Sequence, residues 1–135
     1  MSSQPSRPSW IFNLHDERAG IPRKLAEGIR SRVFAGEHAM LSVVRIEPHA
    51  RGAVHSHPEE QWGILLEGAC VRIQDGVETP VRAGDFWRTP GGVAHGIRTE
   101  GTPALVLDVF SPIREEYTQS GEGFGDAKVV PPAGR

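Results

Sequence analysis

Apolar positions in this chain gather in short segments, each bounded by glycine, proline or acidic residues. Short segments rich in β-branched residues and enclosed by turn residues are typical of β-strands. Asp75–Gly76 lies between two such segments and predicts a tight β-hairpin. Strands are therefore expected at residues 30–36, 40–48, 61–68, 71–73, 77–81, 85–90, 94–99 and 104–112.

One segment, residues 16–29, has helical character, and Pro22 with two glycines limits that segment to a short turn. Strands that recur at a spacing of roughly ten residues favour a sandwich or a barrel closed on itself. The composition agrees, because 16 glycines and 11 prolines indicate many turns rather than long helices. The pattern therefore predicts an all-β fold.

A length of 135 residues suits one domain with one hydrophobic core. Residues 1–9 are polar and contain two prolines, so we expect a flexible N-terminal tail. Residues 118–135 are rich in glycine and include a Pro-Pro pair, which predicts a flexible C-terminal tail or a strap across a dimer partner. The barrel is then expected to span residues 10–117.

Charge and hydropathy exclude several classes of partner. The formal net charge is -2 and the basic residues are scattered, so nucleic acid is not an expected partner. No apolar run is long enough for a membrane span, and the first residues lack the apolar region of a secretory signal. We therefore expect a cytoplasmic protein, and the lone Cys70, which cannot form an internal disulfide, is consistent with a reducing compartment.

Histidines provide the candidate chemistry. His55 and His57 are two residues apart, so on a strand they project to the same side, as two ligands of one metal must. Gln61 is close enough to join them if the chain turns at Pro58. Two alternatives remain open: the pair is a surface feature, or Glu60 rather than Gln61 is the third ligand, although Glu60 has the wrong parity on a strand that starts near it.

A third histidine, His95, follows a Pro-Gly-Gly turn that begins at Pro90. With these residues the sequence resembles the cupin superfamily, whose motifs are Gly-x5-His-x-His-x3-Glu-x6-Gly and Gly-x5-Pro-x-Gly-x2-His-x3-Asn. The matching positions are His55, His57, Gly68, Gly84, Pro90, Gly92 and His95. The resemblance implies a single-domain cupin, a double-stranded β-helix or jelly-roll barrel, which binds one metal through His55, His57, Gln61 and His95.

Three positions depart from the cupin motifs: His49 replaces a glycine, Thr99 replaces the last asparagine, and Gln61 replaces the glutamate. The last change matters most, because an amide contributes a dipole where a carboxylate contributes a negative charge. A set of three histidines and one glutamine suits nickel, zinc, manganese or iron as a divalent ion. It favours Lewis-acid polarisation of an oxygen over the oxygen chemistry of the two-histidine, one-carboxylate iron sites.

Asp108 is an acid within the apolar segment 104–112. Burial raises the pKa of a carboxyl group, so Asp108 is a candidate proton donor or acceptor, unless it forms a structural salt bridge with Arg114. Asp108, Phe110 and Arg114 together resemble the arrangement in KdgF-type cupins, which linearise unsaturated uronates released from pectin and alginate. The resemblance implies that Asp108 transfers protons, Phe110 shapes the pocket and Arg114 binds the carboxylate.

The leading hypothesis is therefore a metal-dependent enzyme that opens the ring of a 4,5-unsaturated uronate, with a small carboxylate-bearing molecule as substrate. Two others remain: a cupin dioxygenase, lyase or isomerase acting on another small metabolite, and a non-catalytic cupin that binds or senses a small acid. A homodimer formed through outer strands is expected. Trp62, Phe86 and Trp87 are then interpreted as core or dimer-packing residues.

Overall fold

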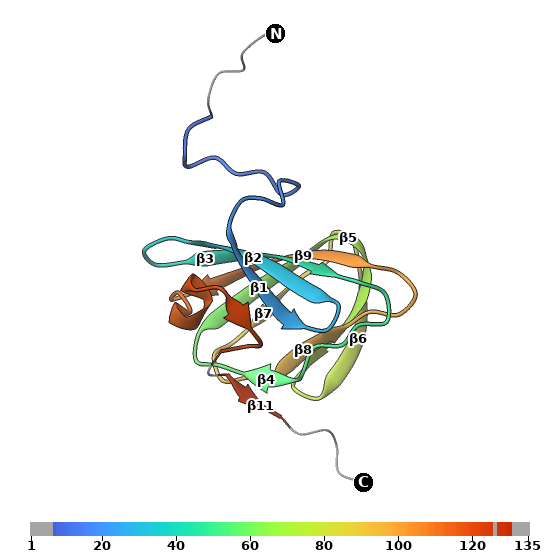
Figure 1. Cartoon of the computed structure of the whole chain (residues 1–135). Coiled ribbons are helices and arrows are strands. Elements are labelled where there is room, and N and C mark those ends of the chain that lie inside the picture. Colours follow the sequence, from blue (N-terminus) through green and yellow to red (C-terminus); the bar gives the residue numbers. More distant parts are fainter. Residues whose placement is uncertain (1–6, 126, 131–135) are drawn as a thin grey trace.

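The computed structural model describes residues 7–125 and 127–130. In this part of the chain the regular structure is almost entirely β, with one short 3-10 helix and no α-helix, which confirms the all-β prediction. Figure 1 shows the strands curled around a common interior. The elements are β1 (Ile21–Ala26), β2 (Ile29–Ala35), β3 (Met40–Ile46), β4 (His55–Ser56), β5 (Glu60–Gln74), β6 (Val77–Arg82), β7 (Phe86–Thr89), β8 (His95–Arg98), β9 (Ala104–Ser111), η1 (Glu115–Thr118), β10 (Gly121–Glu122) and β11 (Lys128–Val129).

The strands pair in the order β10-β1-β2-β3-β9-β5-β8-β4-β11, with β6 and β7 also paired to β5. The long β5 joins the two halves of the barrel, because its first part pairs with β9 and β7 and its second part with β6 and β8. The register shifts between Leu65 and Glu67, and Gly68 follows with a φ of 87°. A Cβ at Gly68 would lie 1.9 Å from the Pro103 carbonyl oxygen, so the bend in β5 requires glycine.

The predicted hairpin at Asp75–Gly76 is confirmed. Gln74 pairs with Val77 across the turn, and both turn residues have positive φ, 50° for Asp75 and 79° for Gly76. Two consecutive positive φ values are the signature of the tight turn whose twist matches that of the flanking strands.

The prediction of a short helical turn within residues 16–29 was wrong, because Ile21–Ala26 forms β1 and pairs antiparallel with β2. Side chains in this segment alternate in burial: Arg23 and Leu25 are buried, whereas Pro22 and Lys24 are exposed. That period of two is a strand pattern, and pairing with β2 outweighed the weak local helical preference.

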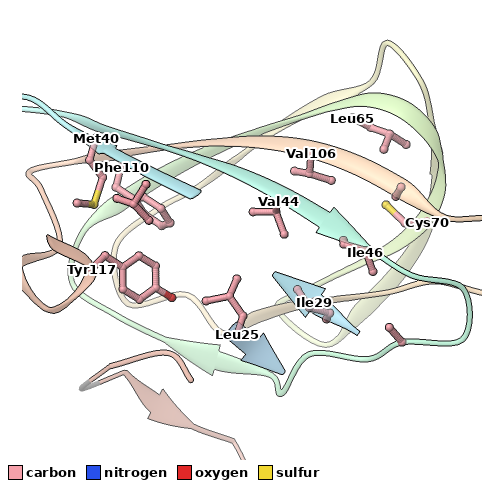
Figure 2. Packing of buried hydrophobic residues seen from close by; sticks show 13 residues of the cluster. Leu25, Ile29, Met40, Val44, Ile46, Leu65, Cys70, Val106, Phe110 and Tyr117 are labelled. Carbon is pink, nitrogen blue, oxygen red and sulfur yellow. The ribbon is translucent and has the colours of Figure 1, made fainter. Parts of the chain in front are cut away.

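Inward-facing side chains from β1, β2, β3, β5 and β9 form the hydrophobic core. Figure 2 shows Leu25, Val44 and Val106 directed to the same interior, with the ring of Tyr117 at one side. The most deeply buried apolar members are Met40, Leu65, Ile29, Val33, Val106, Ile46, Tyr117, Val44 and Phe110. This core holds the surrounding strands in fixed register, and the polar residues described below line a cavity beside it.

After the helix η1 the chain returns across its own barrel. We call residues 119–125 and 127–130 the C-terminal strap; β10 pairs with β1, and β11 pairs with β4, beside which it lies in Figure 1. Arg23 holds η1 and the strap by donating hydrogen bonds to the carbonyl oxygen of Glu116 in η1 and to those of Gln119, Glu122 and Gly123 in the strap. Residues 1–6 and 131–135 of the two expected tails lie outside the described residues. Among the described residues, no helix has the length and apolar character needed to cross a membrane.

Candidate metal centre

Three histidines meet at one side of the barrel interior. His55 is the first residue of β4, His57 follows that strand, and His95 begins β8, where it pairs directly with His55. Their ligand nitrogens all lie within 4.8 Å of one another. All three residues are buried, with exposed fractions of 6% for His55, 4% for His57 and 2% for His95. Strand pairing therefore brings residues from both sequence motifs to one point.

The backbone orients each imidazole in the same way. Carbonyl oxygens lie 2.8 Å from Nδ1 of His55, 3.1 Å from Nδ1 of His57 and 2.9 Å from Nδ1 of His95. These contacts place the hydrogen on Nδ1 and leave the lone pair on Nε2, the arrangement that metal-binding histidines use. Burial lowers the pKa of His55 to about 4 and that of His95 to about 2, so both rings are neutral at physiological pH.

Two features of the ring nitrogens test whether a cation fits between these rings. Nε2 of His95 is buried and has no hydrogen-bond partner among the described residues. Nε2 of His57 lies 3.0 Å from Oε1 of Gln61, so two lone-pair atoms face each other once the hydrogen of His57 is on Nδ1. A divalent transition metal bound between the four side chains would satisfy both features, and imidazole nitrogens and an amide oxygen are suitable donors.

Gln61 is oriented from behind by Asp108. Both residues face the interior, Gln61 on β5 and Asp108 on the neighbouring strand β9, and the Gln61 amide hydrogen-bonds to the Asp108 carboxylate. That bond uses the amide NH2 group and directs the oxygen to the histidines. Glu60, the alternative ligand, faces the other way and accepts a hydrogen bond from Arg88 Nε at 2.6 Å.

Asp108 lines an internal cavity of about 40 Å³ together with the metal-site residues Gln61 and His95. Burial raises the pKa of Asp108 to about 6, opposed by the positive charge of Arg72, the hydrogen bond from Gln61 and the charge of Arg114. A carboxyl group with this pKa can both take up and release a proton near neutral pH.

Arg114 is fully buried at the same cavity. The acidic groups within 4 Å of its guanidinium, among the described residues, are Glu59 at 3.7 Å and Glu116 at 3.4 Å, so the alternative of a salt bridge with Asp108 is not what the structure shows. Nη2 donates to the Phe124 carbonyl oxygen at 2.6 Å, while Nε and Nη1 have no hydrogen-bond partner among the described residues. Nη1 of Arg114 is therefore a donor available for an anion, while Nε already faces the Glu59 carboxylate.

Arg72 and Phe124 line this cavity and were not predicted from the sequence. Arg72 is buried on β5, donates to Thr89 Oγ1 at 2.7 Å and lies 5.3 Å from the ring centre of Trp87. Its sequence signal was a charged residue between Val71 and Ile73 in a buried strand. Phe124, from the C-terminal strap, stacks on His55 with ring centres 4.0 Å apart, and no local pattern indicated this contact.

Comparison with known proteins gives the family. A profile of the cupin domain matches residues 42–110, which is half of the chain. An RmlC-like cupin from Shewanella frigidimarina is 25% identical with a TM-score of 0.68, and the alignment covers 75% of this chain and 91% of that one. No curated protein sequence gave a significant match.

Two further solved structures show the same fold. KdgF from a Halomonas species is 24% identical with a TM-score of 0.67, over 74% of this chain and 93% of that one. The polyketide cyclase RemF from Streptomyces resistomycificus is 20% identical with a TM-score of 0.72, over 91% of this chain and 86% of that one. Together with the profile match and the barrel topology, these similarities show that this chain is a single-domain member of the cupin family.

Proposed function

We propose that this protein is a metal-dependent enzyme that polarises an oxygen of a small sugar acid and opens the ring of a 4,5-unsaturated uronate. The observation that carries the proposal is the convergence of a neutral donor set of three histidines and one glutamine, Asp108 and Arg114 on one cavity. Without a ligand carboxylate, a divalent ion bound there keeps its full charge and acts as a strong Lewis acid on a bound oxygen.

The protein residues would do the following. Arg114 binds the substrate carboxylate through Nη1, which has no hydrogen-bond partner among the described residues, beside Nε, which faces Glu59 Oε1 at 3.7 Å. Asp108 accepts the proton of the anomeric hydroxyl as the bond between that carbon and the ring oxygen breaks, which leaves an aldehyde and an enolate. The same carboxyl group returns the proton to C4 of the former double bond, while C5 becomes the keto carbon. The product is a linear keto acid, and no atoms are gained or lost.

Phe110 and Phe124 form apolar parts of the cavity wall, next to His57 and His55 respectively. A cavity of about 40 Å³ holds a few water molecules and no sugar ring. A bound sugar ring would therefore need more room than this cavity offers, and one residue of its wall, Phe124, comes from the C-terminal strap.

The proposal is tested by adding the unsaturated monosaccharide to metal-loaded protein and following the enol-ether absorbance. Loss of the absorbance with formation of a linear keto acid of the same mass is the expected result. Oxygen consumption during turnover would instead favour a dioxygenase. Binding without turnover would favour the non-catalytic cupin.

Substituting Gln61→Glu is expected to keep metal binding but to lower turnover by roughly tenfold or more. The new carboxylate reduces the positive charge felt by a bound oxygen, and it faces the Asp108 carboxylate where the amide donated a hydrogen bond. Metal content and initial rates of the two proteins, measured side by side, check this. An unchanged rate would show that the neutral ligand is not what sets the chemistry.

We further propose a homodimer formed through the outer face of the barrel. Leu41, Val109 and Trp62 lie side by side on β3, β9 and β5, and the next row contains Leu107, Ile64 and Phe86. Trp62 is 41% and Phe86 67% exposed. A partly exposed apolar face of this kind is typical of a protein interface, and the same face on a second copy is an apolar partner.

The double substitution Trp62→Glu and Phe86→Glu is therefore expected to produce monomers, with the dimer dissociation constant raised at least about 100-fold. Light scattering during size-exclusion chromatography measures the mass. Val77→Glu, at an exposed apolar residue on β6 outside this face, is the matched control and should leave the dimer intact. Monomeric wild-type protein would contradict the proposal.

A further inference from the structure

Ser42 interrupts a row of apolar side chains on β3. The inward-facing residues of this strand are Met40, Ser42, Val44 and Ile46, and all four are buried. Ser42 is 1% exposed, and its hydroxyl has no hydrogen-bond partner among the described residues. Burial of an unpaired hydroxyl is unfavourable, so the core alone gives no reason for serine at this position.

The position of Ser42 indicates what the hydroxyl is for. Ser42 pairs directly with Asp108 across β3 and β9, and both side chains line the internal cavity. The backbone nitrogen of Arg114 lies 3.3 Å from the sulfur of Met40, the inward residue next to Ser42 on the same strand. Ser42 thus lies beside Asp108, to which the proposed function assigns the proton, and shares a cavity with Arg114, to which it assigns the carboxylate.

Unpartnered polar atoms converge on this cavity. Among the described residues, the hydroxyl of Ser42, Nε2 of His95, and Nε and Nη1 of Arg114 are buried without hydrogen bonds, and the three residues line the same cavity. A metal would satisfy His95, so the organic ligand must present one anionic group for Arg114 and one oxygen for Ser42. A serine hydroxyl both donates and accepts, so a hydroxyl or carbonyl oxygen suits it.

We infer that Ser42 is a specificity-determining residue that binds a hydroxyl or keto oxygen of the substrate, next to the carboxylate held by Arg114. The site then takes carboxylic acids that carry further oxygens, such as sugar acids, in preference to plain carboxylic acids. This inference rests on the proposed function for the role of Arg114, but it concerns binding and does not require ring opening.

Binding of two ring-shaped acids to the metal-loaded full chain tests the inference by isothermal titration calorimetry. D-galacturonate carries a carboxylate and hydroxyls and has no enol ether, whereas cyclohexanecarboxylate has a ring and a carboxylate only. Wild-type protein is expected to bind galacturonate more tightly. Ser42→Ala should weaken galacturonate binding by about 3- to 10-fold, the effect of one hydrogen bond, and leave cyclohexanecarboxylate binding unchanged.

Ser31→Ala is the matched control. Ser31 is a buried serine on the adjacent strand β2, and its hydroxyl already donates to the Arg23 carbonyl oxygen at 3.4 Å. This variant should change the affinity for neither acid. Thermal unfolding gives a second readout: Ser42→Ala should keep or raise the unfolding midpoint, because it removes an unpaired buried hydroxyl.

Two results would assign Ser42 a structural role and overturn the inference. One is an equal change in the affinity for both acids, and the other is a lowered unfolding midpoint with unchanged galacturonate affinity. Wild-type protein that binds neither acid would overturn it as well. Failure of the proposed function gives a different pattern, in which the unsaturated uronate is not converted although the Ser42-dependent preference for galacturonate is present.

Discussion

His95→Ala is expected to reduce bound metal from about one ion per chain to nearly none and to lower turnover at least about 100-fold. His95 brings the donor of the second motif to His55 and His57, its ring is fixed by the Val93 carbonyl at Nδ1, and its Nε2 has no partner within the described protein. Removing one of three imidazoles leaves the ion held mainly by two, which is too few for tight binding.

Metal content after dialysis, measured by inductively coupled plasma mass spectrometry, checks this prediction. His38→Ala is the matched control, because His38 is an exposed histidine away from the site and its variant should keep the metal. A circular dichroism spectrum like that of the wild type confirms that His95→Ala is folded. Full metal content in the folded variant would mean that His95 is not a ligand.

Asp108→Asn is expected to lower turnover by about 100- to 10,000-fold while the metal stays bound. Asparagine has the size of aspartate and its oxygen can still accept the hydrogen bond from Gln61, so the ligand set keeps its orientation. What disappears is the group to which we assign the uptake and return of the proton.

Initial rates and metal content of Asp108→Asn, compared with those of Asp85→Asn, separate the two functions of the position. Asp85 is exposed, and its carboxylate accepts a hydrogen bond from the Arg82 backbone, which asparagine can also accept. The control should therefore behave like the wild type. A wild-type rate for Asp108→Asn would remove Asp108 from the mechanism.

Much of the fold was predictable because its signals are local. Alternating apolar segments and turn residues identified β2, β3 and β5 to β9, although β5 was expected as two strands, and the Asp75–Gly76 turn fixed the β5–β6 hairpin. The two-residue strands β4, β10 and β11 were not predicted. β1 was missed because Pro22 and the flanking glycines were interpreted as a helix-limiting pattern, although the alternation from Pro22 to Leu25 is that of a strand. Its partners, β2 and the strap, lie elsewhere in the chain, and their contribution to β1 is not visible in the segment itself.

The candidate site was also predictable only in part. The spacing of His55, His57 and His95 predicted the metal cluster, because the motif positions are fixed relative to strand ends. Residues such as Ser42 and Phe124 could not be found from spacing, because they reach the cavity through strand pairing and through the return of the C-terminal strap. The bond between Gln61 and Asp108 is also a product of packing, and it gives a structural reason for an amide at position 61.

The rate of enol-ether loss as a function of bound metal tests the central claim most directly. Metal-free protein is mixed with the unsaturated monosaccharide, and a divalent ion such as Ni²⁺ or Zn²⁺ is added in steps up to one per chain. A rate that starts near zero and rises in proportion to the metal bound, with a linear keto acid as product, is the predicted result. The claim would be contradicted if the rate were the same with and without metal. It would also be contradicted if the protein, fully loaded with any of the ions that it binds, converted no substrate.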